Sequence, residues 1–200
     1  MKMAQKGFTL IELAIVGIFL GLLAVFAISQ FGGSATNTTR ANAVNEAATK
    51  IADNWSIIAQ QCNTSTDVTA ISLTGGASPA ANNLSMLVGN TQPSATYQAC
   101  YNQSGVRPLA GISTGAAGAE QVQGYTVSVS NGTVGASNAM LVQLAGVPDS
   151  VTLALYNKLS SVAGANSATT VPAAADTTDP QIRFSTATAG LRTVTIVKVL

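Results

Sequence analysis

The sequence contains no histidine, the residue on which much acid–base catalysis and zinc binding depend. Without histidine, neither a Ser-His-Asp triad nor a Cys-His pair can form, and the usual zinc ligand sets are incomplete. The eight acidic residues are scattered, so no pair of carboxylates is placed for acid–base work. No glycine-rich phosphate loop is present. We therefore expect no enzyme, no catalytic residue, and no cofactor or metal.

Charge is also scarce, because only 8% of the residues are charged and the net charge is +1. Ordinary soluble domains carry roughly 25% charged residues. No basic cluster exists, so no nucleic-acid site is evident. A nearly neutral surface has little repulsion between copies, which suits close packing in a polymer and equally suits a plain secreted surface. The length of 200 residues allows one moderate globular domain beside a long N-terminal helix.

The longest apolar run covers residues 8–28 and carries one charge, Glu12. Lys2 and Lys6 precede the run, and the next charge after Glu12 is Arg40. The run reaches about the 20 residues that span a bilayer. The two lysines would hold the N-terminus on the cytoplasmic side of the membrane.

Glu12 needs an explanation, because a carboxylate in a membrane helix costs at least about 2.5 kcal/mol. One explanation is that Glu12 lies shallow enough to reach the lipid headgroups. The other is a cut between Gly7 and Phe8, which would give Phe8 a free amino group. That positive charge could pair with Glu12 of the same chain or of a neighbouring copy.

Residues 6–12, Lys-Gly-Phe-Thr-Leu-Ile-Glu, resemble the processing signal of type IV pilins and the related pseudopilins. The resemblance implies cleavage after Gly7 by a membrane-embedded prepilin peptidase and N-methylation of Phe8. It also implies residence in the inner membrane, followed by polymerisation with further copies into an extracellular pilus on a bacterial surface. Glu12 would act in assembly, and a platform protein and an ATPase would be separate partners.

The resemblance implies an α+β type IV pilin fold, in which a long N-terminal helical spine packs against an antiparallel β-sheet head. Residues 1–7 would be the cleaved leader and 8–34 the transmembrane and filament-core helix. Residues 35–62 would be the amphipathic half of the spine, and 63–200 the globular head. The short leader and Phe8 are similar to type IVa pilins. The chain length and a helix between strands are more similar to type IVb pilins, including those of thin conjugative pili.

Glycines recur in the N-terminal segment at two places. Gly17 and Gly21 form a G-x-x-x-G, which lets helices approach closely in lipid, although one such motif also arises by chance. Gly32 and Gly33 predict a hinge or a locally unwound stretch, because each glycine costs a helix about 1 kcal/mol relative to alanine. The alternative is a helix that tolerates both glycines.

An amphipathic pattern follows, with apolar residues at steps of three and four. Its members are Val44, Ala48, Ile51, Trp55, Ile58 and Cys62. This stripe predicts a helix that lies on the globular domain, with Trp55 as a core anchor.

The two cysteines, Cys62 and Cys100, would both lie outside the membrane in an oxidising compartment. An even count there favours one disulfide over two free thiols. Closing a loop of about 38 residues would stabilise the fold by roughly 4 kcal/mol in the chain-entropy model. The usual pilin disulfide instead closes a C-terminal loop, so no receptor-binding loop is carried over from the family.

Within the predicted head, residues 63–200, clear secondary-structure patterns occur mainly in the second half. Residues 63–122 resemble the variable connecting region of pilins, with short apolar pieces at 68–73 and 84–88. Four strands are predicted, at residues 125–129, 139–144, 182–185 and 193–199, with Asn131-Gly132 as a turn. A helix opening at Pro148-Asp149-Ser150 has an apolar face of Val151, Leu155, Leu159 and Val162, and Gly164 is a plausible stop.

These features predict the major structural subunit of a type IV pilus, and leave open adhesion, motility, DNA uptake or conjugation. The first alternative is a pseudopilin of a type II secretion system. Such proteins often bind calcium, for which Asp176 and Asp179 give thin support. The second is a single-span membrane protein with a periplasmic binding domain that does not polymerise. It leaves Glu12 and the Gly7-Phe8 junction unexplained.

Overall fold

The computed structural model describes residues 10–113 and 119–200, and the side-chain surroundings of residues 35–112 and 119–200. The chain divides into two compact units, Met1–Asn37 and Thr38–Leu200. Within the described part, no helix combines the length and the apolar character needed to cross a membrane. The side chains of the predicted membrane segment, 8–34, lie outside that part, so the segment stays a prediction.

The first helix, α1, covers Leu10–Gln61. Its backbone is helical without interruption through Gly32 and Gly33, so this conformation has no unwound stretch there. The hinge therefore stays a prediction about other states of the chain. The boundary between the two compact units falls five residues beyond Gly32, after Asn37.

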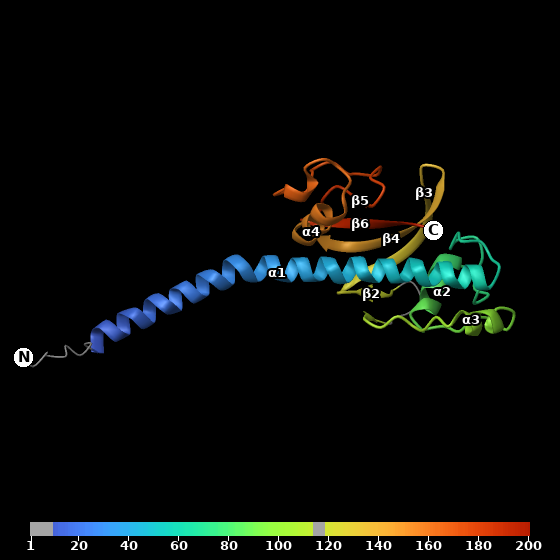
Figure 1. Cartoon of the computed structure of the whole chain (residues 1–200), viewed down its shortest axis with the longest axis horizontal. Helices are drawn as coiled ribbons and strands as arrows, with labels where there is room; N and C mark the ends of the chain where they lie inside the picture. The colour runs from blue at the N-terminus through green and yellow to red at the C-terminus, as the bar shows by residue number, and fades with distance from the viewer. Residues whose placement is uncertain (1–9, 114–118) are drawn as a thin grey trace, which may run out of the picture. The chain divides into compact units, whose positions relative to one another are not determined.

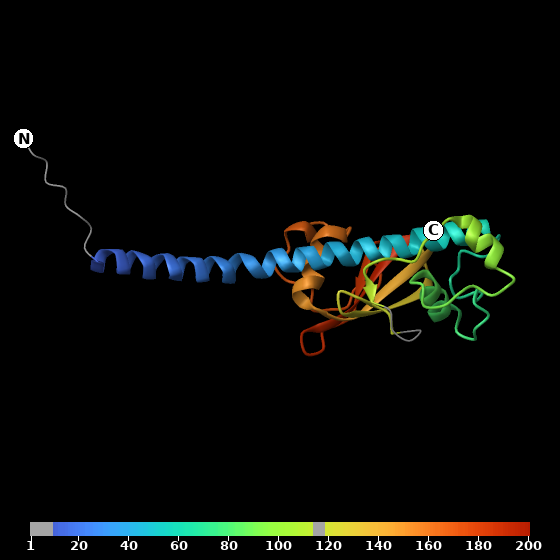
Figure 2. The ribbon, with the colours of Figure 1, turned by 90° about the horizontal axis from the view of Figure 1, so that it is seen from below.

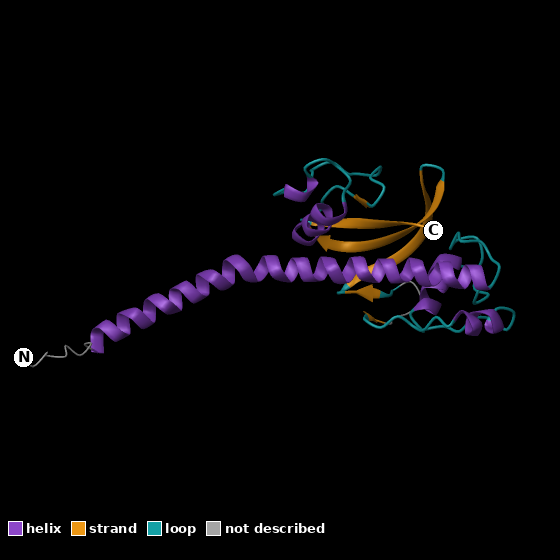
Figure 3. Cartoon of the chain, viewed as in Figure 1, coloured by secondary structure: helices purple, strands orange, loops and turns teal. Residues whose placement is uncertain are grey.

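The second unit has an α+β fold (Figures 1 and 3). Its helices after α1 are α2 (Pro79–Leu87), α3 (Gln98–Ser104), α4 (Asp149–Leu159) and the short 3-10 helix η1 (Ala165–Ser167). Its strands are β1 (Ile112–Ser113), β2 (Gln121–Val122), β3 (Tyr125–Val134), β4 (Ser137–Pro148), β5 (Ile182–Phe184) and β6 (Leu191–Val199). They form one antiparallel sheet in the order β1-β2-β3-β4-β6-β5.

The four predicted strands are all present, and correspond to β3, β4, β5 and β6. The sheet gains β1 and β2, two-residue strands that are too short to show an alternating pattern. They exist because Ile112 pairs with Val122 and Val122 in turn pairs with Tyr125. Gln123 and Gly124 form the connecting turn, and both have positive φ.

The predicted turn at Asn131-Gly132 is wrong, because both residues lie inside β3. The chain turns instead at Gly135 and Ala136, where Gly135 has a φ of 59°. Gly132 has a packing role: a Cβ atom there would lie 2.7 Å from the Leu141 side chain of the adjacent strand. Cross-strand packing thus explains the glycine that local turn statistics assigned to a turn.

Helix α4 begins where the sequence predicts but ends at Leu159, before Gly164. Val151 and Leu155 are buried as predicted, whereas Val162 lies outside the helix and is 49% exposed. Ser160 is extended, and its hydroxyl and the Ser161 backbone N–H both donate to the Asp179 carboxylate. This tertiary contact replaces the next helical turn.

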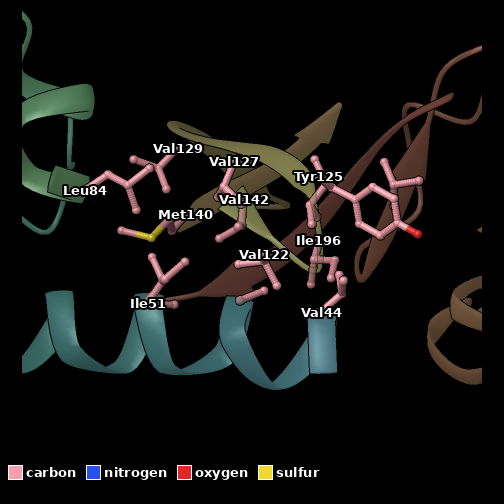
Figure 4. Packing of buried hydrophobic residues seen from close by; sticks show 14 of the residues in the cluster. Val44, Ile51, Leu84, Val122, Tyr125, Val127, Val129, Met140, Val142 and Ile196 are labelled. Atoms are coloured by element: carbon pink, nitrogen blue, oxygen red, sulfur yellow. The ribbon is translucent and has the colours of Figure 1, made fainter. Parts of the chain in front are cut away.

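The core confirms the predicted stripe of α1. Val44, Ala48, Ile51, Trp55 and Ile58 are all buried, and Cys62 is half-buried against the same cluster. Figure 4 shows Val44 and Ile51 directed toward the strands, beside Val122, Val142 and Ile196, with Leu84 of α2 at one end. The rotated view in Figure 2 shows the strands on one side of this half of α1.

Buried polar contacts hold residues 66–83, the first part of the 63–122 region in which the sequence predicted no clear elements. Asn83 of α2 is fully buried; its Oδ1 accepts from the Leu73 N–H at 3.0 Å, and its Nδ2 donates to the Val68 and Ile71 carbonyls. Trp55 Nε1 donates to the Thr66 carbonyl at 2.7 Å. These bonds satisfy backbone groups that a buried loop would otherwise leave unpaired.

Candidate functional site

The predicted processing and assembly residues lie in the N-terminal unit. Gly7 and Phe8 fall outside the described residues. Glu12, Gly17 and Gly21 belong to α1, and their side-chain surroundings are outside the described part. Their roles in cleavage, assembly and helix packing therefore stay predictions. The helical backbone places Gly17 and Gly21 one turn apart, as a G-x-x-x-G requires.

The predicted disulfide is present between Cys62 and Cys100, with their Cα atoms 5.0 Å apart. It joins the residue that follows the last turn of α1 to α3. The chain reversal at Asn63, which has a φ of 50°, brings the connecting region back toward the helix end. The disulfide thus links the connecting region after α1, which has little regular structure, to the C-terminal end of α1.

Two lysines of the head donate hydrogen bonds to α1. Lys158 of α4 reaches Asn42 Oδ1 at 2.7 Å, and Lys198 of β6 reaches Asn45 Oδ1 at 3.2 Å. Burial lowers the pKa of Lys198, although the negative charge of Asp53 acts in the opposite direction. The contacts join the fourth helix and a central strand to successive turns of α1.

The outer surface of the same half of α1 carries one ion pair, in which Lys50 Nζ lies 2.7 Å from Glu46 Oε1. The Lys50 side chain lowers the pKa of Glu46 by hydrogen bonding and by its charge. Both side chains are more than half exposed, so the pair contributes little to stability.

Asp176 and Asp179 are engaged within the protein. Asp176 Oδ1 accepts from the Thr178 N–H and hydroxyl and from the Asp179 N–H. Asp179 is only 4% exposed, and its two carboxylate oxygens accept from Ser160, Ser161, Gln181 and Ile182. Among the described residues, no group of three or more His, Cys, Asp or Glu side chains is placed to hold a metal ion. The suggested calcium site therefore gains no support.

The hydrogen bonds to Asp179 connect the residues after α4 to the residues before β5. Burial by itself would raise the pKa of the Asp179 carboxyl, but donation from Gln181, Ile182, Ser160 and Ser161 outweighs it, so the pKa is lowered. The ionised carboxylate is the form that these donors stabilise. We call this arrangement the Asp179 clasp. It joins the two ends of the segment 160–182 by hydrogen bonds, and no disulfide is involved.

Replacing Asp179 with asparagine is expected to destabilise the fold by about 2 kcal/mol near neutral pH, because an amide nitrogen would face backbone N–H donors. The lowered pKa means that the wild-type clasp stabilises the fold above the ordinary carboxyl pKa of about 3.9, and loses this effect as pH falls through the folded value. Thermal melting of the full chain and of Asp179→Asn, at neutral and at acidic pH, checks this. The gap between the two proteins should narrow in acid, and a gap independent of pH would contradict the clasp.

A second cluster fixes the N-terminus of α4. The buried Arg192 guanidinium forms an ion pair with Asp149 and donates to the Ser185 carbonyl at 2.8 Å. It lies 5.5 Å from the centre of the Phe184 ring, which meets Tyr156 edge-on at 5.7 Å. The carboxylate at the helix start also complements the helix dipole.

Comparison with known proteins gives no match: no protein-family model, no curated protein and no solved structure is similar to the chain. The pilin resemblance therefore rests on the N-terminal residues themselves.

Sequence reasoning missed two buried polar residues, Asn83 and Arg192, and it considered the buried Asp179 only as a calcium ligand. Asn83 and Arg192 bond to residues distant in the sequence, whereas Asp179 bonds both to distant serines and to its neighbours Gln181 and Ile182. The sequence contained one usable signal, the Asp179-Pro180 pair, which is typical of a turn with a side-chain cap.

Proposed function

We propose that this chain is a type IV pilin, the major subunit of a surface filament that assembles through its N-terminal helix. One observation carries the proposal: residues 6–12 read Lys-Gly-Phe-Thr-Leu-Ile-Glu and head an apolar run in which Glu12 is the only charge. A carboxylate within a membrane helix is usually functional and is paired with a group of opposite charge. The amine created at Phe8 by cleavage after Gly7 is that partner.

The head supports the proposal independently. The half of α1 from Thr38 onward buries an apolar stripe against an antiparallel sheet, as a pilin spine is expected to do. The cross-linked Cys62 and Cys100 agree with an oxidising compartment outside the cytoplasm. The low charge of the chain suits the close packing of many identical heads.

In the proposed mechanism, the precursor waits in the inner membrane and prepilin peptidase cuts after Gly7. A platform protein and an ATPase add the mature chain to the base of the filament. Glu12 pairs with the Phe8 amine of an adjacent subunit and sets its axial position. Gly17 and Gly21 let neighbouring helices approach, and apolar contacts between the helices hold the polymer.

Asp176 and Asp179 accept hydrogen bonds within the protein, so they add no weight to a calcium-binding pseudopilin. A short periplasmic pseudopilus remains the competing function, since its subunits share the N-terminal signal. A non-polymerising membrane protein is the third possibility, and it offers no role for Glu12.

The decisive measurement is the intact mass of the protein in a sheared cell-surface fraction, before and after reduction. A chain that starts at methylated Phe8 and gains two hydrogens on reduction is expected. The first property reports processing, and the second reports the bridge between Cys62 and Cys100.

Each other outcome has a distinct meaning. Processed chain found only in the membrane fraction would favour a pseudopilin over a pilus subunit. A chain that still starts at Met1 would refute the proposed processing, and with it the role of the Phe8 amine.

A further inference from the structure

The sheet has a second face, directed away from α1. Val142 and Ile196 point into the core toward α1, where Ile196 lies beside Val44 (Figure 4). Successive strand residues point to opposite faces, so Gln143 and Thr195 lie on the outer face. Gln143 pairs across β4 and β6 with Thr195, which pairs in turn with Arg183 of β5. An amide, a hydroxyl and a guanidinium therefore form one row across three strands.

This row lies in a groove of about 290 Å³. Gln143, Thr193, Thr195 and Arg183 line it together with Asp176, and Leu141 adds an apolar surface. All of these residues belong to the second compact unit, Thr38–Leu200. The site is therefore independent of the N-terminal segment.

The groove has rigid walls. Asp176 exchanges two backbone hydrogen bonds with Phe184, of 2.9 and 2.8 Å, which fixes the loop along one side. Arg183 donates to the carbonyls of Asp179 and Thr133, both at 3.1 Å, and so connects β5 to the end of the β3–β4 hairpin. A preformed groove loses little conformational entropy when a ligand binds.

Three polar side chains of the groove are free to bind a ligand, whereas Arg183 and Asp176 already have partners within the protein. Within the part of the chain that the structure describes, the side chains of Gln143, Thr193 and Thr195 make no hydrogen bond, although Gln143 and Thr195 are only partly exposed. Hydroxyl and amide groups can each donate and accept. The one acid, Asp176, and the one base, Arg183, balance each other, so the groove has no net charge.

We propose that this groove binds a neutral saccharide. A sugar offers several hydroxyl groups that both donate and accept, which matches the row of Gln143, Thr195 and Arg183. Its C–H surface fits Leu141 and the threonine methyl groups. Because the groove carries one charge of each sign, it gives neither an anionic nor a cationic ligand a net electrostatic advantage.

Binding at one groove is weak, because no aromatic ring is exposed for a sugar to stack on: Phe184 lines the groove but is only 2% exposed. Repetition of the groove along a filament would raise the overall avidity by orders of magnitude. This last step alone rests on the proposed function. Binding at a single groove does not require a filament.

The test uses the isotope-labelled full chain in dodecylphosphocholine micelles, since a maltoside detergent would itself be a sugar. Methyl glycosides of glucose, galactose, mannose and N-acetylglucosamine are titrated into the millimolar range, with glucuronate as a charged comparison. We expect amide shifts at Gln143, Arg183 and Thr195 with at least one neutral sugar. Thr195→Val, which removes a hydroxyl from a strand without changing its shape, should weaken binding about fivefold.

The matched control is Thr126→Val, because Thr126 is exposed on β3 and lies outside the groove. Its affinity should stay within about twofold of the wild type. If Thr195→Val fails to fold, Gln143→Met provides the same test. The absence of shifts with every sugar, or equal binding of glucuronate, would overturn the proposal. Neither result bears on the mass measurement at Phe8, so the two ideas fail separately.

Discussion

Replacing Glu12 with alanine is expected to leave cleavage after Gly7 intact and to reduce surface filaments by at least about 100-fold. The reason is that the Phe8 amine of the adjacent subunit would be left without its counter-charge in an apolar environment. Removing one partner of a buried ion pair costs about 3–5 kcal/mol. Because the proposed filament would repeat this contact at every subunit, the loss should be close to complete. Quantifying the chain in the sheared fraction measures it.

The matched control is Glu46→Ala, which removes an acid from the same helix. Glu46 is paired with Lys50 at the protein surface, where an exposed ion pair contributes little to stability. Filament yield should therefore stay near that of the wild type. Normal piliation by Glu12→Ala would show that Glu12 is tolerated merely because it lies near the headgroups, and the proposed role would be wrong.

Replacing Trp55 with alanine is expected to destabilise the head by about 3–5 kcal/mol. Trp55 of α1 is fully buried, and its indole N–H donates to the Thr66 carbonyl of the connecting region. The substitution removes the largest buried side chain of the spine and leaves a cavity. Chemical denaturation of the full chain in micelles gives the difference in unfolding free energy.

Trp55→Phe separates the two contributions of this residue. Phenylalanine retains most of the buried ring surface and loses only the hydrogen bond to Thr66, so a loss of about 1–2 kcal/mol is expected. Ile57→Ala is the control, because Ile57 belongs to the same helix and is 46% exposed. It should change stability by no more than about 0.5 kcal/mol. Equal effects of Trp55→Ala and Ile57→Ala would contradict the assigned core position.

Local patterns sufficed wherever a residue's role depends on its neighbours in sequence. Steps of three and four predicted the buried stripe from Val44 to Ile58. Alternation located the first half of β3, and a continuous apolar run located the middle of β4. The even cysteine count predicted the bridge between Cys62 and Cys100. These features repeat within a few residues or follow from simple counting.

The predictions were wrong where contacts between residues far apart in the sequence determine the local structure. Asn131-Gly132 has the composition of a turn, yet packing against Leu141 keeps Gly132 inside a strand. Val162 has helical spacing, yet the Asp179 carboxylate ends α4 before it. Strands β1 and β2 exist only through their pairing, so no local pattern could reveal them.

The sequence by itself determined the α+β class and the amphipathic half of α1, and it contains the N-terminal motif on which the proposed function depends. The spacing of apolar residues shows which face of a helix or strand is buried, and Glu12 is visible as one carboxylate in an apolar run. Both can be recognised from the order of the residues alone. Only the tertiary structure decided the Asp179 clasp, the six-strand order and the outer groove of Gln143, Thr195 and Arg183. Those features are hydrogen bonds and registers between residues far apart in the chain, whose partners become neighbours only after folding.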